Sequence, residues 1–308
     1  MAINTVIHIG FPKTGTTTHQ IHLFDKHSQI VYLGKPYKEA RFEQELHRLI
    51  KQESTIYDSS ALKEYMKSVK KERPGKNLLL LSEEIMVSLS KVRDKGVVAQ
   101  RIKEVFSPCK ILITIRNQVE MLKSAYINGG RLLAHVPGKY RGRYVPFEDW
   151  LIFQYEYLDR SHMGNFIYFP TIQYYAKLFG KENILVLLFE EFLDQPEQYI
   201  TKLSEFLAID KNESLELLGA EHENVRIDQS RLEFERWVGS RMALGKSRFL
   251  YRLSKVYGYF SHLLAKNKKA KVMIPGPWLE RLRNVYSQGN RQLMAHFHLS
   301  LEQYGYLL

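Results

Sequence analysis

The sequence predicts an α/β protein with a central parallel sheet between two helical layers, like that of P-loop nucleotide-binding proteins. Short apolar runs alternate with longer polar or amphipathic stretches along the chain, which is typical of repeated strand–helix units. The first run ends in a loop with two glycines and a run of threonines, a layout that turns backbone amides toward an anion. We expect the 308 residues to form a single domain, with a core over about 1–235 and a helical extension over about 236–308.

The first predicted strand covers residues 6–9, and the loop 10–15 and the threonines 16–18 follow it. This motif is close to the P-loop, in which a lysine stands directly after the second glycine. Here Thr16 occupies that position, and the lysine stands three residues earlier, at Lys13. A nucleotide kinase needs its lysine after the glycine to reach the β- and γ-phosphates. The displaced lysine therefore predicts a shorter anionic group at this loop.

Another strand is predicted at residues 110–115, where β-branched side chains favour extended structure. It ends at Arg116, and a helix is expected from Asn117 onward, with Ser124 in its second or third turn. The carboxyl ends of parallel strands border the crevice in which open α/β sheets bind ligands. A guanidinium at that place suits a phosphate, because it forms paired and charge-assisted hydrogen bonds.

A strand at residues 77–81 leads directly into Ser82, Glu83 and Glu84. The two carboxylates would face the same crevice. A carboxylate beside a bound anion has a raised pKa, which suits a general base. The structural alternative is a helix N-cap serine followed by first-turn carboxylates. Both interpretations can hold, because the cap and the base are different residues.

Two more strands complete the predicted sheet, a short one near residues 29–34 and one near 183–188. The segment 35–76, between the strands at 29–34 and 77–81, is polar and expected to be helical. After the last strand come an acidic turn, a proline and an amphipathic stretch that predicts a helix with Tyr199, Leu203 and Leu207 buried.

These motifs together resemble the sulfotransferases that use 3′-phosphoadenosine 5′-phosphosulfate (PAPS). The resemblance lies in P-K-x-G-T-T at 12–17, in R-x7-S at 116–124 and in S-x-E at 82–84. It implies transfer of a sulfuryl group from PAPS to a hydroxyl or amine of an acceptor, without a metal. The residues that would hold the 5′-phosphosulfate are Lys13, Thr14, Gly15, Thr16, Thr17 and Thr18.

The same resemblance assigns the 3′-phosphate of PAPS to Arg116 and Ser124. Lys13 would also stabilise the charge that develops on the leaving phosphate. Glu84 is the expected base because it matches S-x-E, and Glu83 is the second candidate. His162 is a further candidate, ranked below Glu84.

Composition favours an enzyme that is not embedded in a membrane. The chain is 44% hydrophobic and carries a single cysteine, Cys109, so it has no internal disulfide. No apolar run approaches eighteen residues, and the first strand begins too early to leave room for a signal peptide. These features predict a cytoplasmic, bacterial enzyme. The eleven histidines show no metal-ligand spacing.

The formal net charge is +12, and part of the excess is concentrated in residues 241–271, which contain nine lysines and arginines and no acidic residue. Apolar residues recur there near helical spacing, which predicts a basic amphipathic helix. This helix could guide an anionic acceptor, rest on the anionic inner face of the membrane, or pack on the core. The expected acceptor is a glycan or glycolipid. No nucleic-acid-binding module is visible, so no nucleic-acid partner is expected.

Two other functions remain open at this point. A P-loop-type kinase is the first, although the position of Lys13 and the lack of an aspartate where strand 110–115 ends argue against it. The second is a non-catalytic protein that binds anionic polymers or membrane surfaces on a degenerate form of the same fold.

Overall fold

The computed structural model describes residues 4–72, 78–88, 94–129, 140, 144–219, 232–233, 236–237, 256 and 270–308. Almost all of the basic segment 241–271 lies outside these residues. Contacts divide the described chain into two compact units. The first comprises the described residues of Met1–Arg116, Tyr168–His222 and Gly289–Tyr304, and the second those of Asn117–Ile167, Glu223–Gln288 and Gly305–Leu308.

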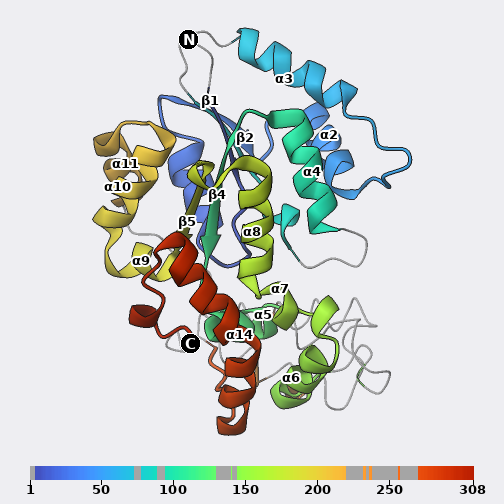
Figure 1. Ribbon diagram of the computed structural model, residues 1–308, viewed down its shortest axis with the longest axis vertical. Helices are drawn as coiled ribbons and strands as arrows, with labels where there is room; N and C mark the ends of the chain where they lie inside the picture. Colours follow the sequence, from blue (N-terminus) through green and yellow to red (C-terminus); the bar gives the residue numbers. More distant parts are fainter. Residues whose placement is uncertain are drawn as a thin grey trace. The chain divides into compact units, whose positions relative to one another are not determined.

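A five-stranded parallel sheet forms the centre of the first unit, with strand order β2-β3-β1-β4-β5 (Figure 1). The strands are β1 (Asn4–His8), β2 (Ile30–Gly34), β3 (Leu78–Ser82), β4 (Lys110–Ile115) and β5 (Ile184–Leu188). The central strand β1 pairs with β3 on one side and β4 on the other, and His8 lies opposite Ser82. The parallel sheet is as predicted, and it brings the loops after β1, β3 and β4 to one edge.

Helices cover both faces of the sheet, which makes the three layers expected from the sequence (Figure 1). The helical elements of this unit are α1 (Thr16–Thr18), η1 (His19–Phe24), α2 (Ala40–Lys51), α3 (Ser60–Glu72), η2 (Glu84–Met86), α4 (Lys95–Phe106), α8 (Tyr168–Phe179), η6 (Lys181–Asn183), α9 (Phe189–Asp194), α10 (Pro196–Leu207), α11 (Lys211–Gly219), residues 289–297 of α14 (Gly276–Phe297) and η8 (Glu302–Tyr304). Helix α8 contacts β4, β5 and α4, whereas α11 contacts the π-helical segment η1 and α10.

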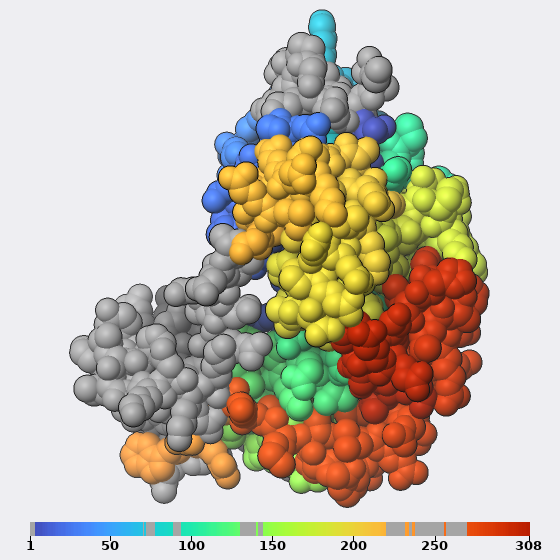
Figure 2. Space-filling view, turned by 90° about the vertical axis from the view of Figure 1, so that its left-hand side faces the viewer, coloured from blue at the N-terminus to red at the C-terminus, as the bar shows by residue number. Residues whose placement is uncertain are grey.

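The core on the η1 side is built from one face of every strand. Val6, Leu80, Leu112 and Leu187 pack there against η1, α10 and α11. Figure 2 shows this side, with α10 and α11 in yellow and orange next to the blue surface of the N-terminal segment. The residues predicted to be buried on the helix after β5, such as Leu203, belong to this core. Burial of these apolar side chains drives the layers together.

The second unit contains α5 (Gln118–Ile127), α6 (Phe147–Glu156), η5 (Leu158–Arg160), α7 (His162–Asn165) and residues 276–288 of α14 (Gly276–Phe297). The Tyr126 ring packs against Trp150, and both side chains are fully buried. The Tyr126 hydroxyl donates to the carbonyl of Val145. None of the helices in the described part of the chain has the length and apolarity needed to cross a membrane.

Candidate functional site

The loop after β1 has an unusual backbone that leaves its amides available. Lys13 and Gly15 both have left-handed backbone angles, with φ of 68° and 78°. This conformation is costly for a lysine, by about 1–2 kcal/mol, and the Thr14 hydroxyl supports it by donating to the Phe11 carbonyl at 2.6 Å. Gly15 is the N-cap of α1, and the first amides of a helix have no acceptor within the helix itself. Such a row of amides at a helix start suits an anion.

The Lys13 side chain is exposed at this loop, whereas Thr14 and Thr16 are buried. Thr17 is exposed and Thr18 half-buried. The residues predicted to hold a phosphosulfate therefore divide into two groups. The lysine and the outer threonines face outward, and the inner threonines shape the loop from beneath.

Arg116 lies directly beside this loop. It follows β4, its Nη1 donates to the Lys13 carbonyl at 3.3 Å, and its guanidinium stacks 4.9 Å from the centre of the Phe189 ring. The Tyr168 hydroxyl donates to the Arg116 carbonyl at 2.7 Å. The fold thus brings two of the predicted donor-binding cations, far apart in sequence, to one place.

Ser124 belongs to the second unit. It lies on α5, whose N-terminus is capped by the Asn117 side chain, which accepts hydrogen bonds from the amides of Val119 and Glu120. The Ser124 side chain is half-buried, and Asn128 Nδ2 lies 3.3 Å from its hydroxyl oxygen. The predicted helix after Asn117 is therefore confirmed, and the role of Ser124 stays a prediction.

Glu83 and Glu84 differ sharply although they are adjacent. The Glu83 side chain is fully buried, and its carboxylate accepts from Lys35 Nζ at 2.8 Å, from the Tyr37 hydroxyl and from the Ile85 amide at 2.9 Å. These three bonds fix the carboxylate as the cap of the short helix η2. A carboxylate that is already so occupied is poorly placed to accept another proton.

Glu84 instead turns toward the loop after β1. Burial raises the pKa of its carboxyl, while a hydrogen bond from Thr16 and the charges of Lys35 and Lys13 oppose that rise. Both Thr16 and Lys13 belong to residues 10–18, the loop after β1 with the helix start that follows it, which we call the anion-binding loop. The candidate base therefore lies near the anion-binding loop, as proton abstraction beside a bound anion requires.

His162 lies on α7 in the second unit, where its ring packs near Trp150 and Phe166 at centroid distances of 6.0 and 6.1 Å. Burial lowers the pKa of His162 to about 4. It is therefore neutral at physiological pH, with its ring surrounded by aromatic side chains. These surroundings are those of a core histidine, and the role of His162 as a base stays a prediction.

Sequence reasoning missed a buried polar cluster beneath the loop. His8, Ser82 and Thr114 are each at most 1% exposed, and they lie at or near the ends of the three central strands. His8 lies 2.8 Å from the Ser82 hydroxyl and 3.3 Å from that of Thr114. The signal that could have found the cluster was a polar residue near the carboxyl end of each of three otherwise apolar strands.

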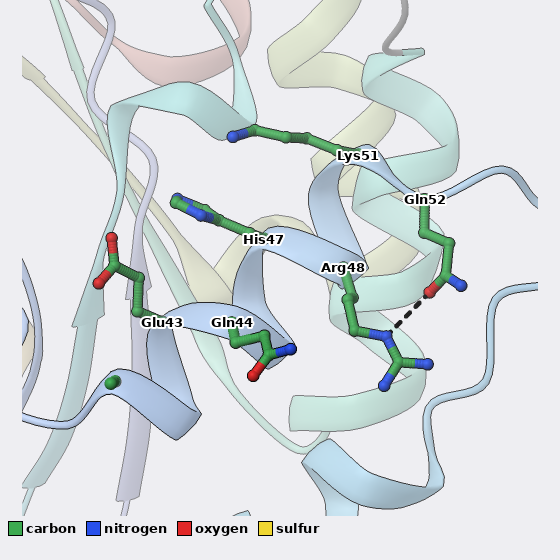
Figure 3. A pocket seen from close by; sticks show the side chains of 7 residues that line it. Glu43, Gln44, His47, Arg48, Lys51 and Gln52 are labelled. Atoms are coloured by element: carbon green, nitrogen blue, oxygen red, sulfur yellow. Dashed lines mark hydrogen bonds between the residues drawn. The ribbon is translucent and has the colours of Figure 1, made fainter.

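An open cavity of about 510 Å³ lies along α2 (Figure 3). Its lining residues are Ala40, Glu43, Gln44, His47, Arg48, Lys51 and Gln52. Tyr37 connects this cavity to the site, because its hydroxyl binds Glu83 and its ring centre lies 6.1 Å from that of His47. Figure 3 shows His47 and Lys51 pointing away from Arg48, which bonds to Gln52.

Residues 4–224 match the model of a protein family described as the sulfotransferase domain. No curated protein matches the sequence. Among solved structures, the chain is similar to a sulfotransferase from Alicyclobacillus acidocaldarius, with 17% identity, 99% of each chain covered and a TM-score of 0.58.

A second similar structure is the mouse sulfotransferase SULT7A1 complexed with PAP, with 12% identity, 98% of this chain and 89% of that chain covered, and a TM-score of 0.46. A third is the sulfotransferase domain of the Synechococcus PCC 7002 olefin synthase, with 12% identity, coverage of 83% and 95%, and a TM-score of 0.44.

Proposed function

The chain belongs to the sulfotransferase domain family, and from that premise we propose that it transfers the sulfuryl group of PAPS to a hydroxyl or amine of its acceptor. One observation carries the proposal: the buried carboxyl of Glu84 lies close enough to Thr16 and Lys13 of the anion-binding loop for both to lower its pKa against the effect of burial. A general base and an anion site close together are the two parts that sulfuryl transfer requires.

The residues around the loop fit the phosphosulfate end of PAPS. The first amides of α1 have no acceptor within the helix and can meet its oxygens, and the exposed Lys13 supplies a positive charge. The Arg116 guanidinium is preorganised by the Phe189 ring beside it and by the Lys13 carbonyl that accepts from its Nη1, while the Tyr168 hydroxyl binds the Arg116 backbone. Arg116 and Ser124 are assigned to the 3′-phosphate and Lys13 to the 5′-phosphosulfate.

In the proposed reaction Glu84 accepts the proton of the acceptor hydroxyl or amine. The acceptor's electron pair forms the new bond to sulfur while the bond between sulfur and the 5′-phosphate oxygen breaks. Lys13 and the loop amides stabilise the charge that the departing phosphate gains. Glu83 does not exchange protons in this scheme, and its role is to hold Tyr37, Lys35 and the start of η2 in place.

A glycan or glycolipid is the proposed acceptor, reached from the cytoplasm or at the inner face of the membrane. The cavity on α2 is the proposed place for the acceptor, because Tyr37 links His47 in its lining to Glu83, next to the candidate base. The basic segment 241–271 would add attraction for an anionic acceptor or membrane.

The test is calorimetric binding of adenosine 3′,5′-bisphosphate, the product of the donor, without Mg²⁺. ATP with Mg²⁺ serves as the comparison. We expect micromolar affinity for the bisphosphate, and a loss of about 10- to 100-fold in Lys13→Ala and in Arg116→Ala, because each removes charged hydrogen bonds. Lys177→Ala is the control, since it removes an exposed charge near the other end of α8.

Preference for ATP with Mg²⁺ would instead indicate a kinase. If neither nucleotide bound, a non-catalytic protein that adheres to anionic surfaces would be the better description. Full affinity in both Lys13→Ala and Arg116→Ala would refute the assignment of the donor site.

A further inference from the structure

A continuous row of hydrogen bonds runs beneath the anion-binding loop through the centre of the sheet. Gln20 Nε2 donates to Ser82 Oγ at 3.0 Å, and Ser82 Oγ lies 2.8 Å from His8 Nδ1. On the other side of the ring, His8 Nε2 lies 3.3 Å from Thr114 Oγ1. Thr114 Oγ1 lies 2.7 Å from Thr14 Oγ1. This row therefore joins three strands to the loop.

The direction of the row follows from counting hydrogens. Each hydroxyl has one hydrogen to donate, and Thr14 donates its hydrogen to the Phe11 carbonyl at 2.6 Å. The 2.7 Å contact between Thr14 and Thr114 therefore needs the hydrogen of Thr114. Since Thr114 has then no hydrogen left for the ring, His8 Nε2 must carry one and donate it.

The same count of hydrogens shows that the other ring nitrogen of His8, Nδ1, is an acceptor. His8 donates from Nε2, and burial lowers the pKa of this fully buried side chain well below its ordinary value, so the ring is neutral and Nδ1 is an acceptor. Ser82 donates to Nδ1 and accepts from Gln20. Every hydroxyl in the row then donates one hydrogen bond, which leaves a single arrangement for the row; Thr14 Oγ1 also lies 3.4 Å from Thr16 Oγ1 and can accept from it as well.

The row ends at the part of the loop that shapes the donor site. Thr14 closes the turn around Lys13, whose backbone is held in the left-handed region, by its bond to Phe11. The backbone of Gly10 packs closely against the row. A Cβ at that position would lie 2.5 Å from Thr114 Oγ1 and 2.9 Å from His8 Nε2, so only glycine fits there. The loop conformation therefore depends on hydroxyl groups whose orientation the His8 ring sets.

We propose that His8 is a positioning residue for donor binding, which acts through Thr114 and Thr14 on the loop that carries Lys13. This inference rests on the proposed function. His8 touches neither donor nor acceptor in this scheme, and its contribution is the hydrogen that Nε2 gives to Thr114. The energetic reason is that a preorganised loop loses little conformational entropy when the donor binds.

Two substitutions of His8 separate this role from simple packing. In His8→Gln the side-chain amide can reach the position of Nε2 and still donate to Thr114. In His8→Asn the shorter side chain can accept from Ser82 but ends before Thr114. Both remove the ring from the same buried site, so a purely structural role predicts similar losses of stability and of donor affinity.

We expect His8→Asn to raise the dissociation constant of adenosine 3′,5′-bisphosphate by about 5- to 30-fold, the equivalent of one or two lost hydrogen bonds. His8→Gln should stay within about threefold of the wild type, with a thermal midpoint similar to that of His8→Asn. Thr114→Val should reproduce the loss in affinity, and Thr114→Ser should avoid it. In the double variant His8→Asn/Thr114→Val the two losses should not add, because both break the same bond.

Equal affinities of His8→Asn and His8→Gln would overturn the inference, as would additive losses in the double variant. If either His8 variant fails to fold, the Thr114 pair provides the same comparison with a smaller change. Failure of the wild type to bind the bisphosphate would refute the proposed function instead, so the two outcomes are distinguishable.

Discussion

The same substitution should affect different properties at the adjacent carboxylates Glu83 and Glu84, stability at the first and turnover at the second. Changing either residue to glutamine removes one negative charge and keeps the shape of the side chain. Glu83 has three hydrogen-bond donors around it. Glu84 instead lies near Thr16 and the positive charge of Lys13, which both lower its pKa. We expect Glu83→Gln to reduce stability and Glu84→Gln to reduce turnover.

The cost of Glu83→Gln follows from its partners. Glutamine offers one acceptor oxygen where the carboxylate offers two, so one of the donors Lys35, Tyr37 and the Ile85 amide faces an amide nitrogen. Breaking a buried ion pair costs about 3–5 kcal/mol, but the Lys35 side chain is 40% exposed and regains water. We expect a loss of about 2–3 kcal/mol, which lowers the thermal midpoint by roughly 3–5 °C.

For Glu84→Gln the expected loss lies in kcat, by about 100- to 10,000-fold, because a positioned general base contributes that much. Glutamine keeps the size and shape of the side chain beside the loop, so affinity for adenosine 3′,5′-bisphosphate should stay within about threefold. Stability should be unchanged or slightly higher, since burial disfavours the ionised carboxylate in the folded state.

The assay combines thermal denaturation, calorimetric binding of the bisphosphate and release of bisphosphate from PAPS with an acceptor found in a glycan and glycolipid screen. Glu84→Asp is the matched control, because it keeps the carboxylate and withdraws it by one methylene group. The reasoning fails if Glu84→Gln turns over like the wild type. It also fails if Glu83→Gln loses turnover while its thermal midpoint and donor affinity stay unchanged.

Two further predictions concern pH. Burial raises the pKa of Glu84 above 4.5, and a protonated Glu84 cannot accept a proton. We therefore expect kcat to fall with decreasing pH, at a midpoint above 4.5. A pH–rate profile that stays flat to pH 4.5 would contradict this. Burial lowers the pKa of Lys95 from 10.5 to about 8, so the folded protein disfavours its ammonium, and stability should fall as pH decreases from about 10.5 to about 8 and then level off. Lys95→Met should therefore stabilise the protein at pH 7 by roughly 3 kcal/mol, and thermal denaturation of variant and wild type at pH 7 and pH 10.5 should show the difference only at pH 7.

The parallel sheet could be predicted because its signals are local. Residues 110–115 form β4 as expected, since a mainly apolar run rich in β-branched residues needs no distant information to be recognised. The helix after Asn117 is marked by its own cap. The departure of Lys13 from the P-loop pattern is also local, and the order of neighbouring residues alone distinguishes a sulfotransferase-like loop from a kinase loop.

The assignment of roles within the site needed the tertiary structure. The sequence ranks Glu84 above Glu83 only by resemblance, because the contacts that occupy Glu83 come from Lys35 and Tyr37, more than forty residues earlier. The row through His8 joins residues 74, 106 and 100 positions apart, and no local pattern encodes those pairings. The sequence determined which strands form and which side chains end them, whereas strand order decided which of those side chains meet. That order depends on packing among distant segments, and therefore so do the hydrogen bonds that shape the donor loop.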